Sequence, residues 1–170
     1  EGSANNVSLL VMKTNKRVGD YLIAKTTVNL VLAAISFGIM LVLGIEFALL
    51  WAVLIGLLNY IPYLGSIIGV MLPVLLSLAQ FGSLGSALAA FVGLMGAQMF
   101  AAYVLEPRML GKSVNLSPFI VLVALAFWTP MWGAIGAVLA VPLTAVAMII
   151  MAEVRVLRPF AVLISESGEV

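Results

Sequence analysis

Long apolar segments, separated by short polar or Pro- and Gly-containing breaks, make up most of this chain. Residues 26–45 and 86–105 would each form a helix about 30 Å long, which is enough to cross a bilayer. Two apolar hairpins, 47–80 and 118–152, follow these segments, and each has Pro and Gly at its tip. The pattern therefore predicts an all-α integral membrane protein with two full spans and two helical hairpins.

The hairpins turn at Asn59–Gly65 and at Trp128–Gly133. Their first arms, 47–60 and 118–128, are only about 21 and 16 Å long as helices, against about 30 Å for the hydrocarbon core. Helices that end inside a membrane expose polar backbone groups, and secondary transporters use such ends to bind substrates. We therefore interpret both hairpins as re-entrant.

Basic residues indicate how the segments are oriented. All eight lie on one side of the membrane if the first span runs outward and the second runs inward. The positive-inside rule makes that side, and both ends of the chain, cytoplasmic. Segments 26–81 and 86–152 then have opposite orientations and form a candidate inverted repeat. A bundle of six ordinary spans gives the same basic side, because 66–80 and 134–152 are long enough to cross alone, and this alternative stays open.

We divide the chain into three parts. Residues 1–25 alternate apolar and basic groups, as in an amphipathic helix on a membrane surface or a helix packed on a soluble part. Residues 26–152 are the expected transmembrane transport domain, and 153–170 are a polar tail. Glu1 is not a Met and the first 25 residues are too polar for a signal peptide, so we expect a segment of a longer protein.

The composition argues against most other classes of protein. Apolar residues make up 64% of the chain and charged residues 9%, and the mean hydropathy is +1.25. An ordinary soluble domain is about 25% charged. The chain has no His and no Cys, which removes the usual acid–base, thiol and metal-binding chemistry. We expect no enzyme activity, cofactor, metal or nucleic-acid partner, but a bilayer and a small solute or coupling ion.

Polar side chains inside apolar segments mark a candidate transport path. Asn59 and the tyrosines of the first tip place polar groups in lipid, and Pro62 leaves a carbonyl without its donor. Gln98 is in mid-span, where an unpaired amide is costly. The alternative is structural, namely interfacial turns and aromatic anchors. We assign to the path Asn59, Tyr60, Pro62, Tyr63, Gly65, Gln98, Thr129 and Pro130.

A charged cluster, Glu106-Pro107-Arg108, ends the second full span. A carboxylate beside a cation at this position suits a gate or a coupling site. An interfacial salt bridge that closes the helix is the alternative. We assign Glu106 and Arg108 to the gate or coupling pair.

Three blocks together resemble a known family. They are LLNYIPYLG at 57–65, EPRMLGKSVNLSP at 106–118 and WGAIGAVLAVPL at 132–143. Their order and spacing are similar to the C-terminal half of the autoinducer-2 exporter (AI-2E, PerM-like permease) family, over roughly residues 7–158. Ser117 stands where the family usually has His. The motif residues are Asn59, Pro62, Gly65, Glu106, Pro107, Gly111, Pro118, Gly133, Gly136 and Pro142.

The resemblance implies a transporter in the bacterial inner membrane. Family members are linked to export of the quorum-sensing signal autoinducer-2, and some to sodium–proton exchange. We expect an exporter of a small polar metabolite such as autoinducer-2, working by alternating access. A sodium–proton antiporter is the alternative, and a non-transporting membrane scaffold or assembly protein is the alternative of another class. We also expect a homo-oligomer, because a two-hairpin unit needs a fixed partner to move against.

The lack of cysteine allows a direct test of the hairpin topology. Single cysteines at Leu64 and Thr129 should react with small polar thiol reagents through water and resist bulky impermeant ones. Labelling is followed by mass shift in membrane vesicles of each orientation. Complete labelling of either position by the bulky reagent from one face would contradict the re-entrant interpretation there.

Overall fold

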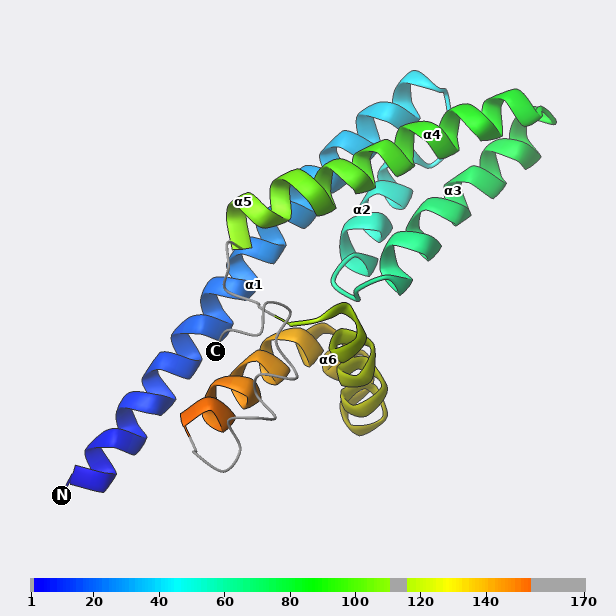
Figure 1. Cartoon of the computed structure of the whole chain (residues 1–170). Helices are drawn as coiled ribbons and strands as arrows, with labels where there is room; N and C mark the ends of the chain where they lie inside the picture. The colour runs from blue at the N-terminus through cyan, green and yellow to red at the C-terminus, as the bar shows by residue number, and fades with distance from the viewer. Residues whose placement is uncertain (1, 111–115, 154–170) are drawn as a thin grey trace. The chain divides into compact units, whose positions relative to one another are not determined.

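The computed structural model describes residues 2–110 and 116–153, and the regular elements within them are helices (Figure 1). This confirms the all-α prediction. The elements are α1 (Gly2–Val42), α2 (Ala48–Leu58), α3 (Leu64–Phe81), α4 (Leu84–Phe100), the π-helical turn η1 (Ala101–Leu105), α5 (Glu106–Leu110) and α6 (Pro118–Glu153). The motif residue Gly111 lies outside the described residues. The predicted tail 153–170 does so too, apart from Glu153, which ends α6.

Four stretches of helix are long and apolar enough to cross a membrane: Val18–Val42, Leu64–Phe81, Leu84–Met109 and Pro118–Met148. Leu84–Met109 contains the predicted span 86–105, and Val18–Val42 contains the predicted span 26–45 except for its last three residues. The first arm of the first hairpin is the 11-residue α2, about 16 Å long, whereas α3 reaches about 27 Å. The chain is thus a multi-pass membrane protein, while the re-entrant hairpins and the inverted repeat stay predictions.

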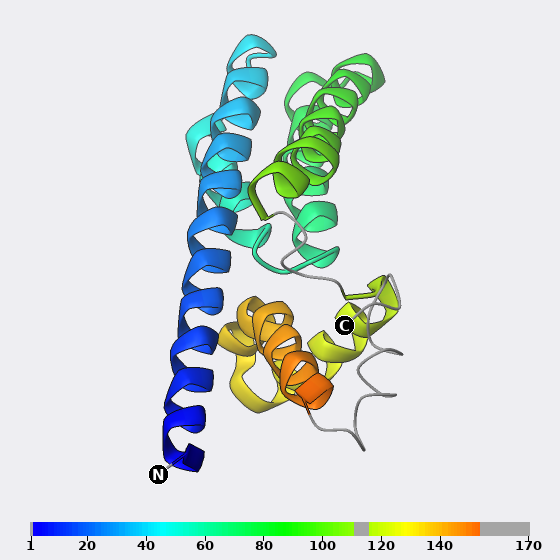
Figure 2. The same cartoon turned by 60° about the vertical axis from the view of Figure 1, so that its left-hand side comes forward.

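The chain divides into two compact units, one of residues 24–109 and one of residues 1–23 with 110–170. Helix α1 continues without a break through the division between residues 23 and 24 (Figure 2). The predicted surface segment and the predicted first span therefore lie on one helix. In the 24–109 unit, α3 packs on both α2 and α4. The second full span therefore lies with the first hairpin in one unit.

Small residues of α2 and α4 pack inside the 24–109 unit, while many large apolar side chains of the same helices face outward. The buried residues of α2 include Ala48, Ala52 and Gly56, and those of α4 include Ala87, Ala90 and Ala97. Large apolar side chains are exposed on the same helices, among them Leu49, Leu57, Leu88 and Val92. Membrane helices associate in this way, because small residues let backbones approach and lipid solvates the large side chains.

The side chain of Gln80 holds the connection between α1 and α2. Its Nε2 donates to the carbonyl of Gly44 at 2.9 Å, and its Oε1 accepts from the N–H of Glu46 at 2.9 Å. Gly44 and Phe47 have φ values of 69° and 56°, so the loop uses left-handed backbone on both sides of this clamp. The end of α3 is thereby tied to the start of the hairpin that it closes.

In the other unit, α6 is interrupted at Gly133, whose φ of 62° and ψ of −139° are accessible almost only to glycine. The two arms meet beyond this break. The Nε1 of Trp128 donates to Oγ1 of Thr144 at 3.1 Å, and a Cβ on Gly136 would lie 2.0 Å from the carbonyl oxygen of Trp128. The chain therefore turns back at the predicted second tip.

Candidate functional site

The first hairpin turns on a strained residue, Tyr63. Its φ of 62° and ψ of −55°, with the N–H of Leu64 donating to the carbonyl of Pro62 at 2.7 Å, define a γ-turn of the rare, strained kind. Such backbone costs about 1–3 kcal/mol and clusters at functional sites. Next to it, a Cβ on Gly65 would lie 1.7 Å from the carbonyl oxygen of Leu58, so the arms can meet only at a glycine.

Two side-chain hydrogen bonds dock this tip on α1. The Nδ2 of Asn59 donates to Oδ1 of Asn29 at 2.8 Å in a buried contact. The hydroxyls of Tyr60 and Thr26 share a hydrogen bond of 2.6 Å. Both α1 residues lie at the start of the predicted first span, so the tip is level with the charged end of that span.

An ion pair lies beside the docked tip. The Nζ of Lys25 contacts Oε1 of Glu106, and the two side chains are 7% and 29% exposed. Lys25 precedes Asn29 by one helical turn and shares its buried face. The partner of the Glu106 carboxylate is thus Lys25, 81 positions away in the sequence. Arg108, the cation two residues after Glu106, is exposed. The predicted gating role of Glu106 and Arg108 stays a prediction.

A π-helical turn, Ala101–Leu105, comes directly before Glu106. A π-turn holds more residues than an α-turn, so it changes the direction in which the following side chains point. Single π-turns inside α-helices are frequent at functional sites. Here the turn separates the regular part of α4 from the carboxylate that binds Lys25.

Gln98 is 6% exposed, and its Nε2 has no hydrogen-bond partner within the described part of the chain. The side chain of Gln98 is therefore buried within the 24–109 unit. Its role in a transport path stays a prediction.

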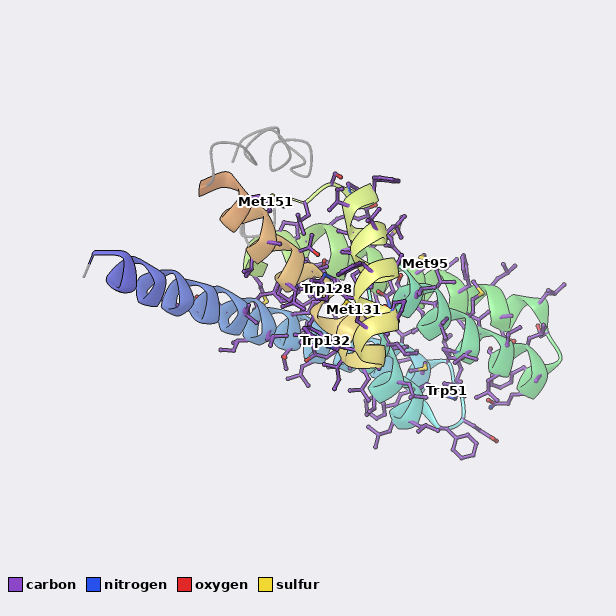
Figure 3. All side chains as sticks on the ribbon, turned by 90° about the horizontal axis from the view of Figure 1, so that it is seen from below. Trp51, Met95, Trp128, Met131, Trp132 and Met151 are labelled. Carbon is purple, nitrogen blue, oxygen red and sulfur yellow. The ribbon has the colours of Figure 1, made fainter. Side chains whose placement is uncertain are left out.

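The second tip lies in the other unit, and its Thr129 and Pro130 are exposed. Figure 3 shows Trp128 and Trp132 beside each other on α6, and their ring centroids are 5.2 Å apart. Trp128 also meets Phe127 edge to face at 5.0 Å. Aromatic clusters of this kind suit a membrane interface. That the two tips line one path stays a prediction.

Three residues of α1 that lie at or beside the docked tip were not predicted as site residues from the sequence: Lys25, Thr26 and Asn29. Lys25 was counted only as one of the basic residues that set orientation. A signal was present, because Lys25 and Asn29 lie four residues apart on the same helical face as the fully buried Leu32. A polar pair on a core-facing stripe requires partners inside the protein.

The chemistry available at this site is hydrogen bonding and one ion pair. Within residues 2–110 and 116–153, no group of three or more His, Cys, Asp or Glu side chains could hold a metal ion. A shallow groove between α1 and α4, lined by residues such as Ala34, Gly38, Ala89 and Gly93, is apolar.

A multi-pass helical membrane protein with a polar, strained hairpin tip inside its helices has the architecture that membrane transporters use. The chain belongs to the AI-2E transporter family, since the model of the AI-2E family transporter matches residues 3–156. The proteins of this family are transporters and not enzymes.

Several named proteins are similar to this chain. A putative transport protein of Borreliella burgdorferi is 36% identical over 154 residues, which cover 90% of this chain and 42% of that protein. The AI-2 transport protein TqsA of Escherichia coli K12 is 31% identical over 149 residues, which cover 88% of this chain and 43% of that protein. The chain thus spans less than half the length of these relatives.

Glu106→Gln should lower the free energy of unfolding by about 2 kcal/mol, because it leaves the buried ammonium of Lys25 without a counter-charge. The double variant Lys25→Met with Glu106→Gln should recover most of this loss. Unfolding in mixed detergent micelles measures both changes. Arg108→Gln is the matched control and should change stability by less than about 0.5 kcal/mol. A larger loss of stability in Arg108→Gln than in Glu106→Gln would contradict the assigned pair.

Proposed function

We propose that this chain forms the membrane core of an exporter for a small polar metabolite such as autoinducer-2. The observation that carries the proposal is the first hairpin tip, which holds a strained Tyr63 and docks its polar side chains on α1. The family assignment supports transport. The Escherichia coli relative is named an AI-2 transport protein, which supports a small polar metabolite as the cargo. The proteins compared are longer, so the complete parent protein would carry the activity.

Alternating access would use the tip as its moving part. Two hydrogen bonds hold the tip on α1 in the described state, and beside them an ion pair joins α1 to Glu106 at the start of α5. Each such contact contributes about 1–3 kcal/mol at most, so a bound solute can exchange them for its own contacts. The strain at Tyr63 favours release of the turn once those contacts are lost.

Sodium–proton exchange is a second candidate, and Glu106 favours it. Its carboxylate is 29% exposed and has a cation, Lys25, as its partner. A carboxylate that water can reach and that already binds an ammonium group is suited to exchange cations. We place both functions in the bacterial inner membrane, with cytoplasmic chain ends and a homo-oligomeric assembly.

Flux in everted vesicles that contain the complete parent protein tests the proposal. Autoinducer-2 uptake and sodium-driven proton movement are followed side by side. Asn59→Ala should reduce autoinducer-2 flux at least about tenfold, because it removes the amide that the solute would contact once Asn29 has released it. Glu46→Gln, an exposed change at the opposite end of the unit, is the control.

The two candidates give different results. Sodium–proton exchange without autoinducer-2 movement would replace the exporter by the antiporter and move the site to Glu106. Absence of both fluxes, with protein present in the membrane, would contradict both proposals and favour the scaffold.

A further inference from the structure

Four polar side chains inside the 24–109 unit are more than nine-tenths buried and have a polar atom without a partner among the described residues. One is Ser77, which is 0% exposed and lies near the end of α3. The other three are Asn29, Ser36 and Gln98, which are 3%, 1% and 6% exposed, and their atoms without a partner are Nδ2, Oγ and Nε2 respectively. Each such group costs several kcal/mol in a membrane interior unless something binds it.

Two contacts between α1 and the helical stretch Leu84–Met109 show how far along the helix axes these residues lie. The two helices run antiparallel, because Lys25 contacts Glu106 at one end and Ile39 lies against Gly93 at the other. A Cβ on Gly93 would lie 2.9 Å from Cγ2 of Ile39. Counting from this contact at 1.5 Å per residue, Gln98 lies within about one helical turn, roughly 5 Å, of the height of Ser36.

Both side chains enter the same core. Ser36 lies four residues after Leu32 and four before Met40, and both neighbours are 0% exposed. Gln98 follows Leu94, also 0% exposed, by four residues on α4. Leu32, Met40 and Leu94 belong to one cluster of buried residues. The hydroxyl of Ser36 and the amide of Gln98 thus face one interior at one depth.

That depth is the middle of the predicted span 26–45. The charged residues of the 24–109 unit are Lys25, Glu46, Glu106 and Arg108, and all lie near the ends of its helices. Ser36, Gln98 and Asn29 are neutral, and two of their three unpartnered atoms are amide N–H donors. Such donors suit oxygen acceptors on a solute, and no charged side chain of the unit lies at this depth to pair with a charged one.

We propose that Ser36 and Gln98 form a mid-span binding site for an uncharged small solute rich in hydroxyl, ether or carbonyl oxygens. Asn29, about 10 Å from Ser36 along α1, links this site to the docked tip and the Lys25–Glu106 pair. The inference rests on the proposed transport function and identifies the class of solute. It places the path through the interior of the 24–109 unit.

Cysteine reactivity tests the site in the complete parent protein, with any other cysteines replaced. Ser36→Cys and Gln98→Cys should react with methyl methanethiosulfonate at least tenfold faster than Val28→Cys and Ala90→Cys. All four positions are buried, on the same two helices, and the control residues Val28 and Ala90 belong to the cluster of buried apolar residues. Only the thiolate reacts, and a thiolate forms only where water or polar groups solvate it. Equal, slow reaction at all four positions would overturn the site.

Protection identifies the class of solute. Erythritol, an uncharged polyol, should slow modification at positions 36 and 98, whereas sodium chloride of equal osmolarity should not. Fast reaction that neither additive slows would overturn the solute site and indicate a water-filled cavity. Protection by the salt alone would overturn the assignment to an uncharged solute. These readouts do not depend on flux, so they separate this inference from the transport proposal.

Gln98→Met provides a second measurement, because it keeps the size of the side chain and removes the unpartnered amide. A binding role predicts unchanged or higher thermal stability together with a loss of autoinducer-2 flux of at least tenfold. Flux equal to that of the unmodified protein would overturn the role of Gln98.

Discussion

The arrangement of the 24–109 unit depends on the requirement that polar groups in hydrocarbon find partners inside the protein. The tip of the first hairpin carries the amide of Asn59 and the phenol of Tyr60. Their hydrogen-bond partners on α1 are Asn29 and Thr26 respectively. Because these partners lie one turn or less from Lys25, the same stretch of α1 also binds Glu106 from the other span. One segment of helix thus joins the hairpin to both spans.

Close backbone approach makes this docking geometrically possible. Glycines at positions 56 and 65 leave no room for a Cβ without displacement: at Gly65 it would meet the Leu58 carbonyl, and at Gly56 it would lie 3.2 Å from the Asn29 carbonyl oxygen. Alanines and a glycine of α2 and α4 pack in the interior, while large side chains of these helices, such as Leu49, Leu88 and Val92, face outward. Large apolar side chains are as well solvated by lipid as by another helix, so they do not determine which helices pack together. The specificity of packing comes from small residues and the few polar contacts.

Hydrophobic pattern alone predicted the helical membrane fold, the two long spans and the positions of both turns. It also drew attention to Asn59, Tyr60 and Glu106, because polar groups stand out in apolar segments. It did not identify Lys25 as the partner of Glu106, since the two are 81 residues apart and Arg108 is the nearer cation in sequence. Strain at Tyr63 was equally hidden, because only the backbone angles show that a bulky residue has a positive φ.

The central claim is that the contact between the first tip and α1 must open during transport. Paired cysteines at Asn29 and Asn59, whose side chains lie 2.8 Å apart, allow the contact to be closed by oxidation or by a short bifunctional reagent. Autoinducer-2 flux by the complete parent protein is then measured before bridging, after bridging and after reduction. We expect bridging to abolish the flux that the double-cysteine variant retains, and reduction to restore it to its level before bridging. Flux that bridging leaves unchanged would contradict the claim that this contact must open.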